Sequence, residues 1–469
     1  MSRALLSSVF VLSTAALSCG PGLDSRAPAR SNVAAQWFDR AKASYRAADF
    51  EDAREAARQA VAAAPNDAEA RALAARIALV RLDYAEALRL TEGLESSDAH
   101  AVRGRAYWFS GDIEHAADEL EALLADPTVK DPWARDVAGL ARRGVGRHPF
   151  EMEGGLVASV EMPRAIDRVT LGAADVVPCE LDGEQILALV ATGSSEVLID
   201  SNSRGEPAWV NVRFDRIEFK DVPALVQDLS PIARQIGVPI RALLGAQLLR
   251  HAHATFDRRG DQFVVRRQDA APPPDASRVP LYYFRGGGML VRATVTSRDQ
   301  NPIALFVDSS RPFPLLLQDD AWRRAGVDVK SLAPVPDNPG VKRGTVPMFR
   351  VGGFDLAHMP AIEGVDLGDF GTSFDIDLGG VVGADLLAFF RVTFADEGRF
   401  LWVEPDPLLL GPEQSPSGSA PPAPAAPHAS PATPTAPPPT PAPPASPASP
   451  ATPAPPAASA PSTAPRPVQ

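Results

Sequence analysis

The chain has 469 residues, of which 45% are hydrophobic, so it is long enough to bury about two to four separate cores. Its formal net charge is -12 at pH 7 and its pI is near 5.2. This acidic balance argues against a nucleic-acid partner, because nucleic-acid binding needs clustered positive charge to displace counterions from the phosphates.

The first 19 residues have the pattern of a secretion signal. Arg3 precedes an apolar run from Ala4 to Leu17 that is too short to span a bilayer as a helix. The small and apolar residues before Cys19 resemble a bacterial lipobox, and this resemblance implies cleavage before Cys19 and lipid attachment to its thiol. An ordinary secretory signal with an incidental cysteine is the alternative. We expect export across the inner membrane and a lipid anchor in the cell envelope, on the periplasmic face or at the outer membrane.

An internal repeat marks residues 32–145. Three copies of an Asp-hydrophobic-x-x-Ala pattern begin at Asp49, Asp83 and Asp112, the first two 34 residues apart and the third 29 residues further on. A period near 34 residues, with small residues that let paired helices approach closely, resembles tetratricopeptide repeats. The segment from Lys130 to Arg143 is expected to cap the stack. A plain helical bundle is the alternative, although it would have no reason to keep the period.

After Gly146 the pattern changes to short apolar segments separated by Gly, Pro, Asp and Asn, which is typical of strands and turns. Two such segments flank the turn pair Asp182-Gly183 and predict a hairpin. The second strand of this hairpin leads directly into the run from Leu189 to Ser194. Residues 155–268 are therefore expected to form a mainly β unit, which we call lobe 1.

A second copy of the β pattern indicates a tandem duplication, with residues 279–406 as lobe 2. The segment from Ile303 to Ser310 aligns with that from Ile186 to Gly193 at an offset of 117 residues. The segment from Leu243 to Gly245 aligns with that from Val381 to Gly383 at an offset of 138. Further pairs in the same order, all at the offset of 138, are Thr255 with Thr393, Phe256 with Phe394 and Gly260 with Gly398.

Each lobe resembles a retropepsin-like or pepsin-like aspartic protease unit. The run from Leu189 to Ser194 is similar to the hydrophobic-hydrophobic-Asp-Thr-Gly-Ser motif of that family, and the later hydrophobic-hydrophobic-Gly segments are similar to its second motif. The resemblance covers a little over half of the chain, and it implies that the second-motif glycines let backbone pass close to the active-site loops. The positions carried over are Ala191, Thr192, Gly193, Ser194 and Gly245 in lobe 1, and Asp308, Ser309, Ser310 and Gly383 in lobe 2.

The resemblance also implies a chemistry that needs two carboxylates, one acting as base on a water and the other donating a proton to the substrate carbonyl. Ala191 stands at one of these positions and Asp308 at the other, so the paired lobes supply one carboxylate. Ser309 is expected to keep the cross-lobe hydrogen bonds of the family's threonine, whereas the Cβ of Ser310 is expected to strain or block its loop. The alternative role for Asp308 is to cap a turn of its own backbone.

The expected fold class is therefore multidomain, with an α-helical tetratricopeptide-like repeat, two retropepsin-like lobes and a disordered tail over residues 411–469, which are rich in Pro, Ala, Ser and Thr. We expect a catalytically degenerate lipoprotein that binds peptides or proteins on the concave helical surface or between the lobes. The alternatives are an active aspartic endopeptidase, with two copies of Asp308 meeting in a homodimer of lobe 2, and a structural envelope protein. His251 and His253 would share one face of an expected strand, but no third ligand lies near them, so we expect a solvated edge, no metal and no cofactor.

Overall fold

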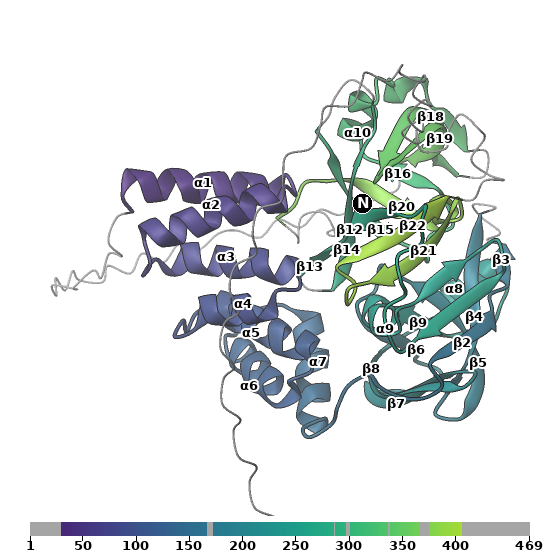
Figure 1. Ribbon diagram of the computed structural model, residues 1–469, viewed down its shortest axis with the longest axis horizontal. Coiled ribbons are helices and arrows are strands. Elements are labelled where there is room, and N and C mark those ends of the chain that lie inside the picture. The colour runs from purple at the N-terminus through teal and green to yellow at the C-terminus, as the bar shows by residue number, and fades with distance from the viewer. Residues whose placement is uncertain are drawn as a thin grey trace, which may run out of the picture. The chain divides into compact units, whose positions relative to one another are not determined.

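The structure is a computed structural model that describes residues 30–166, 172–285, 287–296, 301–335, 338–364 and 375–405. Within these ranges the N-terminal part forms helices and the rest is mainly β structure (Figure 1). None of the helices in this part of the chain is long and apolar enough to cross a membrane. The signal segment with Cys19 and the proline-rich residues 411–469 lie outside the described residues, so both stay predictions.

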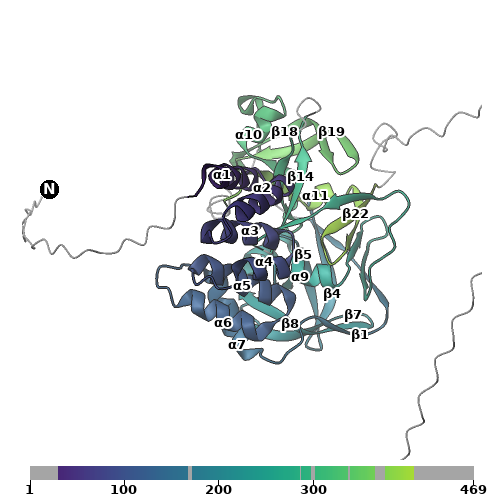
Figure 2. The ribbon, with the colours of Figure 1, turned by 60° about the vertical axis from the view of Figure 1, so that its left-hand side comes forward.

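The helical region is a stack of three helix pairs followed by one more helix, in chain order (Figure 2). The repeat is visible where the second helix of each pair begins. Asp49, Asp83 and Asp112 cap these helices, and each accepts a hydrogen bond from the backbone N–H three residues on. The helices are α1 (Asn32–Arg46), α2 (Phe50–Ala63), α3 (Ala68–Val80), α4 (Tyr84–Thr91), α5 (Ser97–Ser110), α6 (Ile113–Leu124) and α7 (Pro132–Arg143).

The turn before each cap has the same conformation in all three copies. Ala48, Leu82 and Gly111 precede the caps, and their φ angles are 54°, 59° and 87°. Each chain reversal therefore uses one residue in the left-handed region. The alanine of each copy, Ala53 in the first, is completely buried, so the paired helices approach as closely as a methyl group allows. The predicted helical repeat is thus present, and α7 stands where the capping helix was expected.

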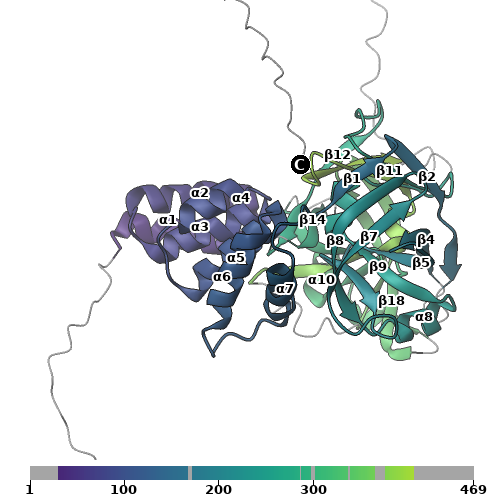
Figure 3. The same ribbon diagram turned by 90° about the horizontal axis from the view of Figure 1, so that it is seen from below.

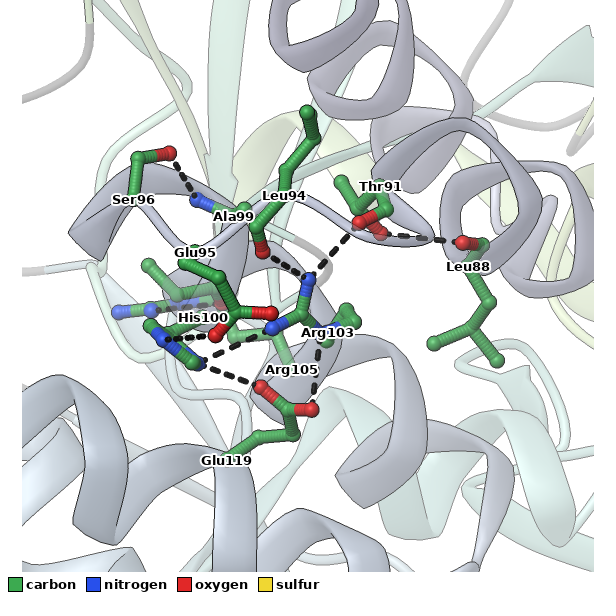
Figure 4. A network of polar contacts seen from close by, with 11 residues as sticks. Leu88, Thr91, Leu94, Glu95, Ser96, Ala99, His100, Arg103, Arg105 and Glu119 are labelled. Atoms are coloured by element: carbon green, nitrogen blue, oxygen red, sulfur yellow. Dashed lines mark hydrogen bonds and ion pairs between the residues drawn. The ribbon is translucent and has the colours of Figure 1, made fainter. Parts of the chain in front are cut away.

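Arg103 joins the second helix pair to the third (Figure 4). One guanidinium nitrogen, Nη1, donates to the carbonyls of Thr91 and Leu94 at 2.8 and 2.7 Å, while Nε lies 2.8 Å from the carboxylate of Glu119 on α6. Nδ1 of His100 lies 2.7 Å from the same carboxylate. Because the carbonyls at a helix end have no donors within the helix, one arginine both caps α4 and fixes α6 beside it.

The β region contains one sheet for each predicted lobe. The order in lobe 1 is β1-β8-β6-β9-β5-β4-β3, with β7 paired to β4 and β8, and the order in lobe 2 is β13-β14-β15-β20-β16-β19-β18-β17. The lobe 1 sheet begins before the predicted start of the lobe at residue 155, and its strands are β1 (Glu151–Gly154), β3 (Arg164–Ile166), β4 (Ala173–Leu181), β5 (Glu184–Ala191), β6 (Val197–Asp200), β7 (Ala208–Phe214), β8 (Ile217–Gln227) and β9 (Ile240–Gly245). The lobe 2 strands are β13 (Tyr282–Phe284), β14 (Gly288–Thr294), β15 (Ile303–Asp308), β16 (Leu315–Leu317), β17 (Ala333–Val335), β18 (Asn338–Val351), β19 (Phe354–Glu363) and β20 (Leu378–Gly383). The short helices are α8 (Ser230–Ile236), α9 (Ala246–His251), α10 (Asp319–Arg324), η1 (Val329–Ser331) and α11 (Ala384–Leu387).

Both lobes have the same strand connections around the predicted active-site position. β5 runs parallel to β9 and pairs Ala191 with Gly245, while β15 runs parallel to β20 and pairs Asp308 with Gly383. On the far side of β9 and β20 lie the antiparallel strands β6 and β16, which are in turn parallel to β8 and β19. This shared topology supports the tandem duplication inferred from the aligned segments.

A third sheet joins the two lobes, and the sequence did not predict it. Its order is β12-β22-β21-β10-β11-β2. Thr255 on β10 pairs with Thr393 on β21, and their hydroxyl oxygens lie 2.8 Å apart. These two threonines are equivalent in the duplicated halves, and equivalent residues pair with each other only at a two-fold axis. The strands are β2 (Val157–Glu161), β10 (Thr255–Asp257), β11 (Gln262–Arg266), β12 (Ser277–Pro280), β21 (Phe390–Ala395) and β22 (Phe400–Pro405).

The helical region packs against lobe 2, and the helices lie to one side of the strands (Figure 3). Successive side chains of β15 point to opposite faces. Leu305 and Val307 join the core inside the lobe, whereas Ala304 and Phe306 join a cluster with Tyr45 and other residues of α1 to α3. In lobe 1 the equivalent face of β5 packs against the short helix α8. The repeat stack therefore covers in lobe 2 the face that α8 covers in lobe 1.

Candidate active site

The two predicted active-site loops are held together by hydrogen bonds between the lobes. Thr192 Oγ1 donates to the carbonyl of Val307 at 3.0 Å and accepts from the N–H of Ser309 at 2.9 Å. The hydroxyl of Ser309 donates to the carbonyl of Val190 at 3.0 Å and accepts from the N–H of Thr192 at 3.1 Å. All four bonds are buried, and each has a counterpart across the two-fold axis. The hydrogen bonds expected of Ser309 are therefore present.

The second-motif glycines lie against the loops, as expected. A Cβ on Gly245 would be 2.1 Å from the carbonyl oxygen of Glu196, and one on Gly383 would be 2.0 Å from that of Phe313. In each lobe the residue after the glycine donates its N–H to a loop carbonyl at 2.8 Å, and in lobe 1 that carbonyl belongs to Ser194. Only glycine permits so close an approach of two backbone segments.

Asp308 lies where the two loops meet. Gly193 of the opposite loop is so near that a Cβ at that position would be 2.6 Å from the carboxyl carbon of Asp308. Oδ1 of Asp308 accepts from the N–H of Ser310 at 3.0 Å and from its hydroxyl at 2.6 Å. Oδ2 lies 3.2 Å from Nε of Arg311, and the Asp308 side chain is 13% exposed. Both carboxylate oxygens are thus engaged by their own loop.

Ser310 neither strains nor blocks this loop, so that expectation was wrong. Its φ lies outside the left-handed region, and a residue with a side chain adopts such a conformation freely. The hydroxyl turns onto the carboxylate of Asp308 instead of projecting toward lobe 1. Asp308 in turn accepts from the N–H two residues on, which is the turn-capping role considered as the alternative.

Ala191 occupies the equivalent position in lobe 1. It is 2% exposed and packs with Leu189 and Leu243 beneath α8. A methyl group cannot titrate, so a water at this junction would meet one carboxylate, which is already paired with Arg311. None of the five cavities described for this part of the chain, the largest about 920 Å³, is lined by Ala191 or Asp308.

Glu196 is a buried carboxylate beside the lobe 1 loop that the sequence reasoning missed. It is 2% exposed, and its Oε1 accepts from the indole N–H of Trp133 at 2.9 Å and of Trp108 at 3.3 Å. The hydroxyl of Ser195 donates to Oε2. Burial raises the pKa of Glu196 above its usual range. Because both tryptophans belong to the helical region, this carboxylate joins α5 and α7 to the active-site loop. No local sequence pattern signals this contact, because the two tryptophans lie 63 and 88 residues away from Glu196 in the chain.

His251 and His253 do not lie on a strand, so that expectation was wrong. His251 ends the helix α9, and its ring stacks on Phe150 with the centroids 4.4 Å apart. Burial lowers the pKa of His251 well below its usual value, and the residue is half-buried. Nδ1 of His253 lies 2.7 Å from Asp269. Across the described ranges, no three His, Cys, Asp or Glu side chains are grouped so that they could hold a metal ion.

No protein-family model matches the chain, and the comparison with curated proteins finds no significant match. An aspartic proteinase from Irpex lacteus is similar at 12% identity and a TM-score of 0.34, over 54% of this chain and 98% of that one. A retropepsin-like aspartic protease from Rickettsia conorii is similar at 18% identity and a TM-score of 0.21, over 27% and 90%. The TPR (tetratricopeptide repeat) domain of OM64 from Arabidopsis is similar at 16% identity and a TM-score of 0.23, over 24% and 97%. The helices and sheets of the chain itself show a helical repeat region followed by a mainly β region with two similarly connected lobes, which confirms those parts of the predicted fold class.

Proposed function

We propose that this chain is a catalytically degenerate aspartic-protease-like protein that acts as a peptide- or protein-binding module. The supporting observation is an intact pair of loops with an incomplete pair of acids. Thr192 and Ser309 keep the loops in register across the lobes, yet Ala191 stands opposite Asp308. Attack of water on a peptide needs a base and an acid at this place, and one carboxylate paired with Arg311 does not supply both.

The contacts at the axis disfavour the alternative of an active homodimer built from two copies of lobe 2. In such a dimer a second Ser309 would have to replace Thr192 of the same chain. The two Ser309 hydroxyls could bond each other's loops, but the four buried hydrogen bonds to lobe 1 would be broken, and Thr192 and the carbonyl of Val190 would lose these partners. The direct pairing of Thr255 with Thr393 would be lost as well. Buried donors and acceptors left without partners are costly, so the lobes of one chain are the favoured pair.

A peptidase assay with four proteins tests this function, using a mixed peptide library at acid and neutral pH. The wild type, Asp308→Ala and Ala191→Asp are all expected to leave the library uncut. In Ala191→Asp the surviving acid is still held by Ser310 and Arg311. The triple variant Ala191→Asp, Ser310→Gly, Arg311→Ser supplies the second acid in lobe 1, gives lobe 2 the Gly-Ser ending of the lobe 1 loop, and is the one expected to gain cleavage. Pepstatin-sensitive cleavage by the wild type, abolished in Asp308→Ala, would contradict the proposal.

The binding half of the proposal is tested separately, by retention of library peptides on the immobilised wild type and on Asp308→Ala. Because binding does not require a titrating acid, equal retention by the two proteins is expected. Failure of both to retain any peptide would contradict a binding role and favour a structural one.

We also propose that the protein is an exported lipoprotein anchored in the cell envelope through Cys19. The support is the short apolar run and the small residues that precede this cysteine. Cells fed a labelled fatty acid should label the wild type and not Cys19→Ser. An unlabelled wild type would favour the ordinary secretory signal.

A further inference from the structure

Two neighbouring cavities lie between the first helices of the repeat pairs and lobe 2. Their volumes are about 500 and about 260 Å³, and both are lined by Tyr45, Arg76 and Asp375. We call their helical side, with Lys42, Arg46 and Leu73 in addition to Tyr45 and Arg76, the helical groove. We call the lobe 2 segment Asp375–Asp377 the strap.

The strap lies in the helical groove in the manner of a bound peptide. Ile376 is 3% exposed and packs in one cluster with Tyr45 and Leu73. The backbone N–H of Asp377 donates to the carbonyl of Arg46, the last residue of α1, at 2.7 Å. This carbonyl has no donor within its own helix, so the strap satisfies it.

The two acidic side chains of the strap, one on each side of Ile376, lie opposite basic side chains of the groove. The carboxylate of Asp375 lies 3.5 Å from Arg76, and that of Asp377 lies 3.7 Å from Arg46. In the larger cavity every cationic side chain comes from the helices, and both carboxylates come from the strap. Without the strap this part of the groove would present Lys42 and two arginines around an apolar floor. Such a surface favours a ligand with acidic groups on both sides of an aliphatic one.

The strap is held weakly enough to be exchanged. The side chains of Asp375 and Asp377 are 73% and 72% exposed, and ion pairs as exposed as these contribute little to stability. Among the described residues, the strap's other contacts with the helices are the packing of Ile376 and the backbone hydrogen bond from Asp377 to Arg46. An external segment with the same contacts can therefore compete with the strap.

We propose that the helical groove binds extended acidic segments with a central aliphatic side chain, and that the strap is the occupant the chain itself supplies. This inference rests on the proposed binding function and names its site and ligand class. The resident strap closes the groove in the resting protein and lowers its apparent affinity for an outside peptide. The strap continues directly into β20, whose Gly383 pairs with Asp308, so an exchange at the groove acts on the strand beside the lobe 2 loop.

Fluorescence anisotropy with the full chain tests the inference. The probe is a labelled peptide with the sequence of residues 375–380, Asp-Ile-Asp-Leu-Gly-Gly, and the control peptide carries asparagine at both acidic positions. Ile376→Ser releases the strap, so it should bind the probe about tenfold more tightly than the wild type does. Adding Arg46→Glu and Arg76→Glu should abolish this binding. Adding Arg234→Glu on the exposed face of α8 is the matched control and should leave it intact.

A second release variant guards against misfolding of Ile376→Ser. Asp375→Asn with Asp377→Asn keeps the aliphatic anchor, so it should tighten probe binding by a smaller factor than Ile376→Ser does. Equal affinity of the wild type and both release variants overturns the inference. Probe binding that survives Arg46→Glu and Arg76→Glu also overturns the inference. The probe would then bind at another site, and the proposed binding function would still stand. Failure of the probe and of every library peptide to bind any variant overturns both proposals.

Discussion

Replacing Glu196 by glutamine should make the protein more stable than the wild type at neutral pH and equally stable at acid pH. Burial raises the pKa of this carboxyl, so the folded protein holds its proton more firmly than the unfolded chain does. At pH values below the ordinary glutamate range, Glu196 is protonated in both the folded and the unfolded protein. The stabilising contribution of the protonated carboxyl to folding is then fully present. It is lost as the pH rises from that range through the raised pKa of the folded protein. At pH values above both the folded and the unfolded pKa, each unit by which folding raises the pKa lowers the free energy of unfolding by about 1.4 kcal/mol relative to acid pH.

Glutamine removes this pH dependence and keeps the contacts. Its carbonyl oxygen can accept from Trp133 and Trp108, and its amide can donate to the Ser195 hydroxyl, which rotates to accept. Alanine differs, because it leaves three donors without acceptors, one of them at the longer distance of 3.3 Å. We expect Glu196→Ala to lower the free energy of unfolding by about 3 to 5 kcal/mol.

Urea unfolding followed by tryptophan fluorescence at about pH 4, 6 and 8 gives the free energies of unfolding. The stability difference between Glu196→Gln and the wild type should be near zero at the lowest pH and should grow in favour of the variant as the pH rises. Glu206→Gln, at an exposed glutamate of lobe 1, is the matched control and should show no trend. A Glu196→Gln protein that falls further below the wild type with rising pH would refute the argument from burial.

Three further substitutions test the loops and the repeat. Thr192→Val removes a hydroxyl that both donates and accepts hydrogen bonds across the lobes. The free energy of unfolding in urea should therefore fall by about 2 to 3 kcal/mol. A loss below about 0.5 kcal/mol would contradict the assigned bonds. Gly383→Ala places a Cβ 2.0 Å from a backbone oxygen and should lower the melting temperature sharply. Its control is Gly205→Ala, whose Cβ meets no atom within 4 Å and which should change the free energy of unfolding by about 0.5 kcal/mol or less. Asp83→Ala removes the N-cap of α4 and should cost about 1 kcal/mol by thermal unfolding; an unchanged melting temperature would argue against the capped repeat turn.

The helical repeat was predictable because its causes are local. A capping aspartate, a left-handed residue before it and an alanine after it act within a few residues of one another, as Asp49, Ala48 and Ala53 show. The second-motif glycines were predictable for a related reason. Gly245 and Gly383 stand at aligned positions where backbone must pass close to backbone, and that need depends on residue type alone.

The role of Ser310 was not predictable, because a side chain's effect depends on which way it turns. The residue type shows that a Cβ is present, and only the loop geometry shows that the hydroxyl reaches Asp308. Glu196 was missed for the same reason. Its acceptors meet two tryptophans that are distant in the sequence, and no local pattern records such a contact.

The residues alone determined the repeat and the duplicated lobes, and they place Ala191 at the position equivalent to Asp308, since these features follow from spacing and residue type. Tertiary structure decided how the parts meet: the third sheet across the axis, the helical cover over Phe306, and the strap in the helical groove. Apolar alternation marks Phe306 and Ile376 as inward-facing, but it does not say which surface they will face. That choice is made by long-range packing, where segments far apart in the chain bury each other's apolar surface.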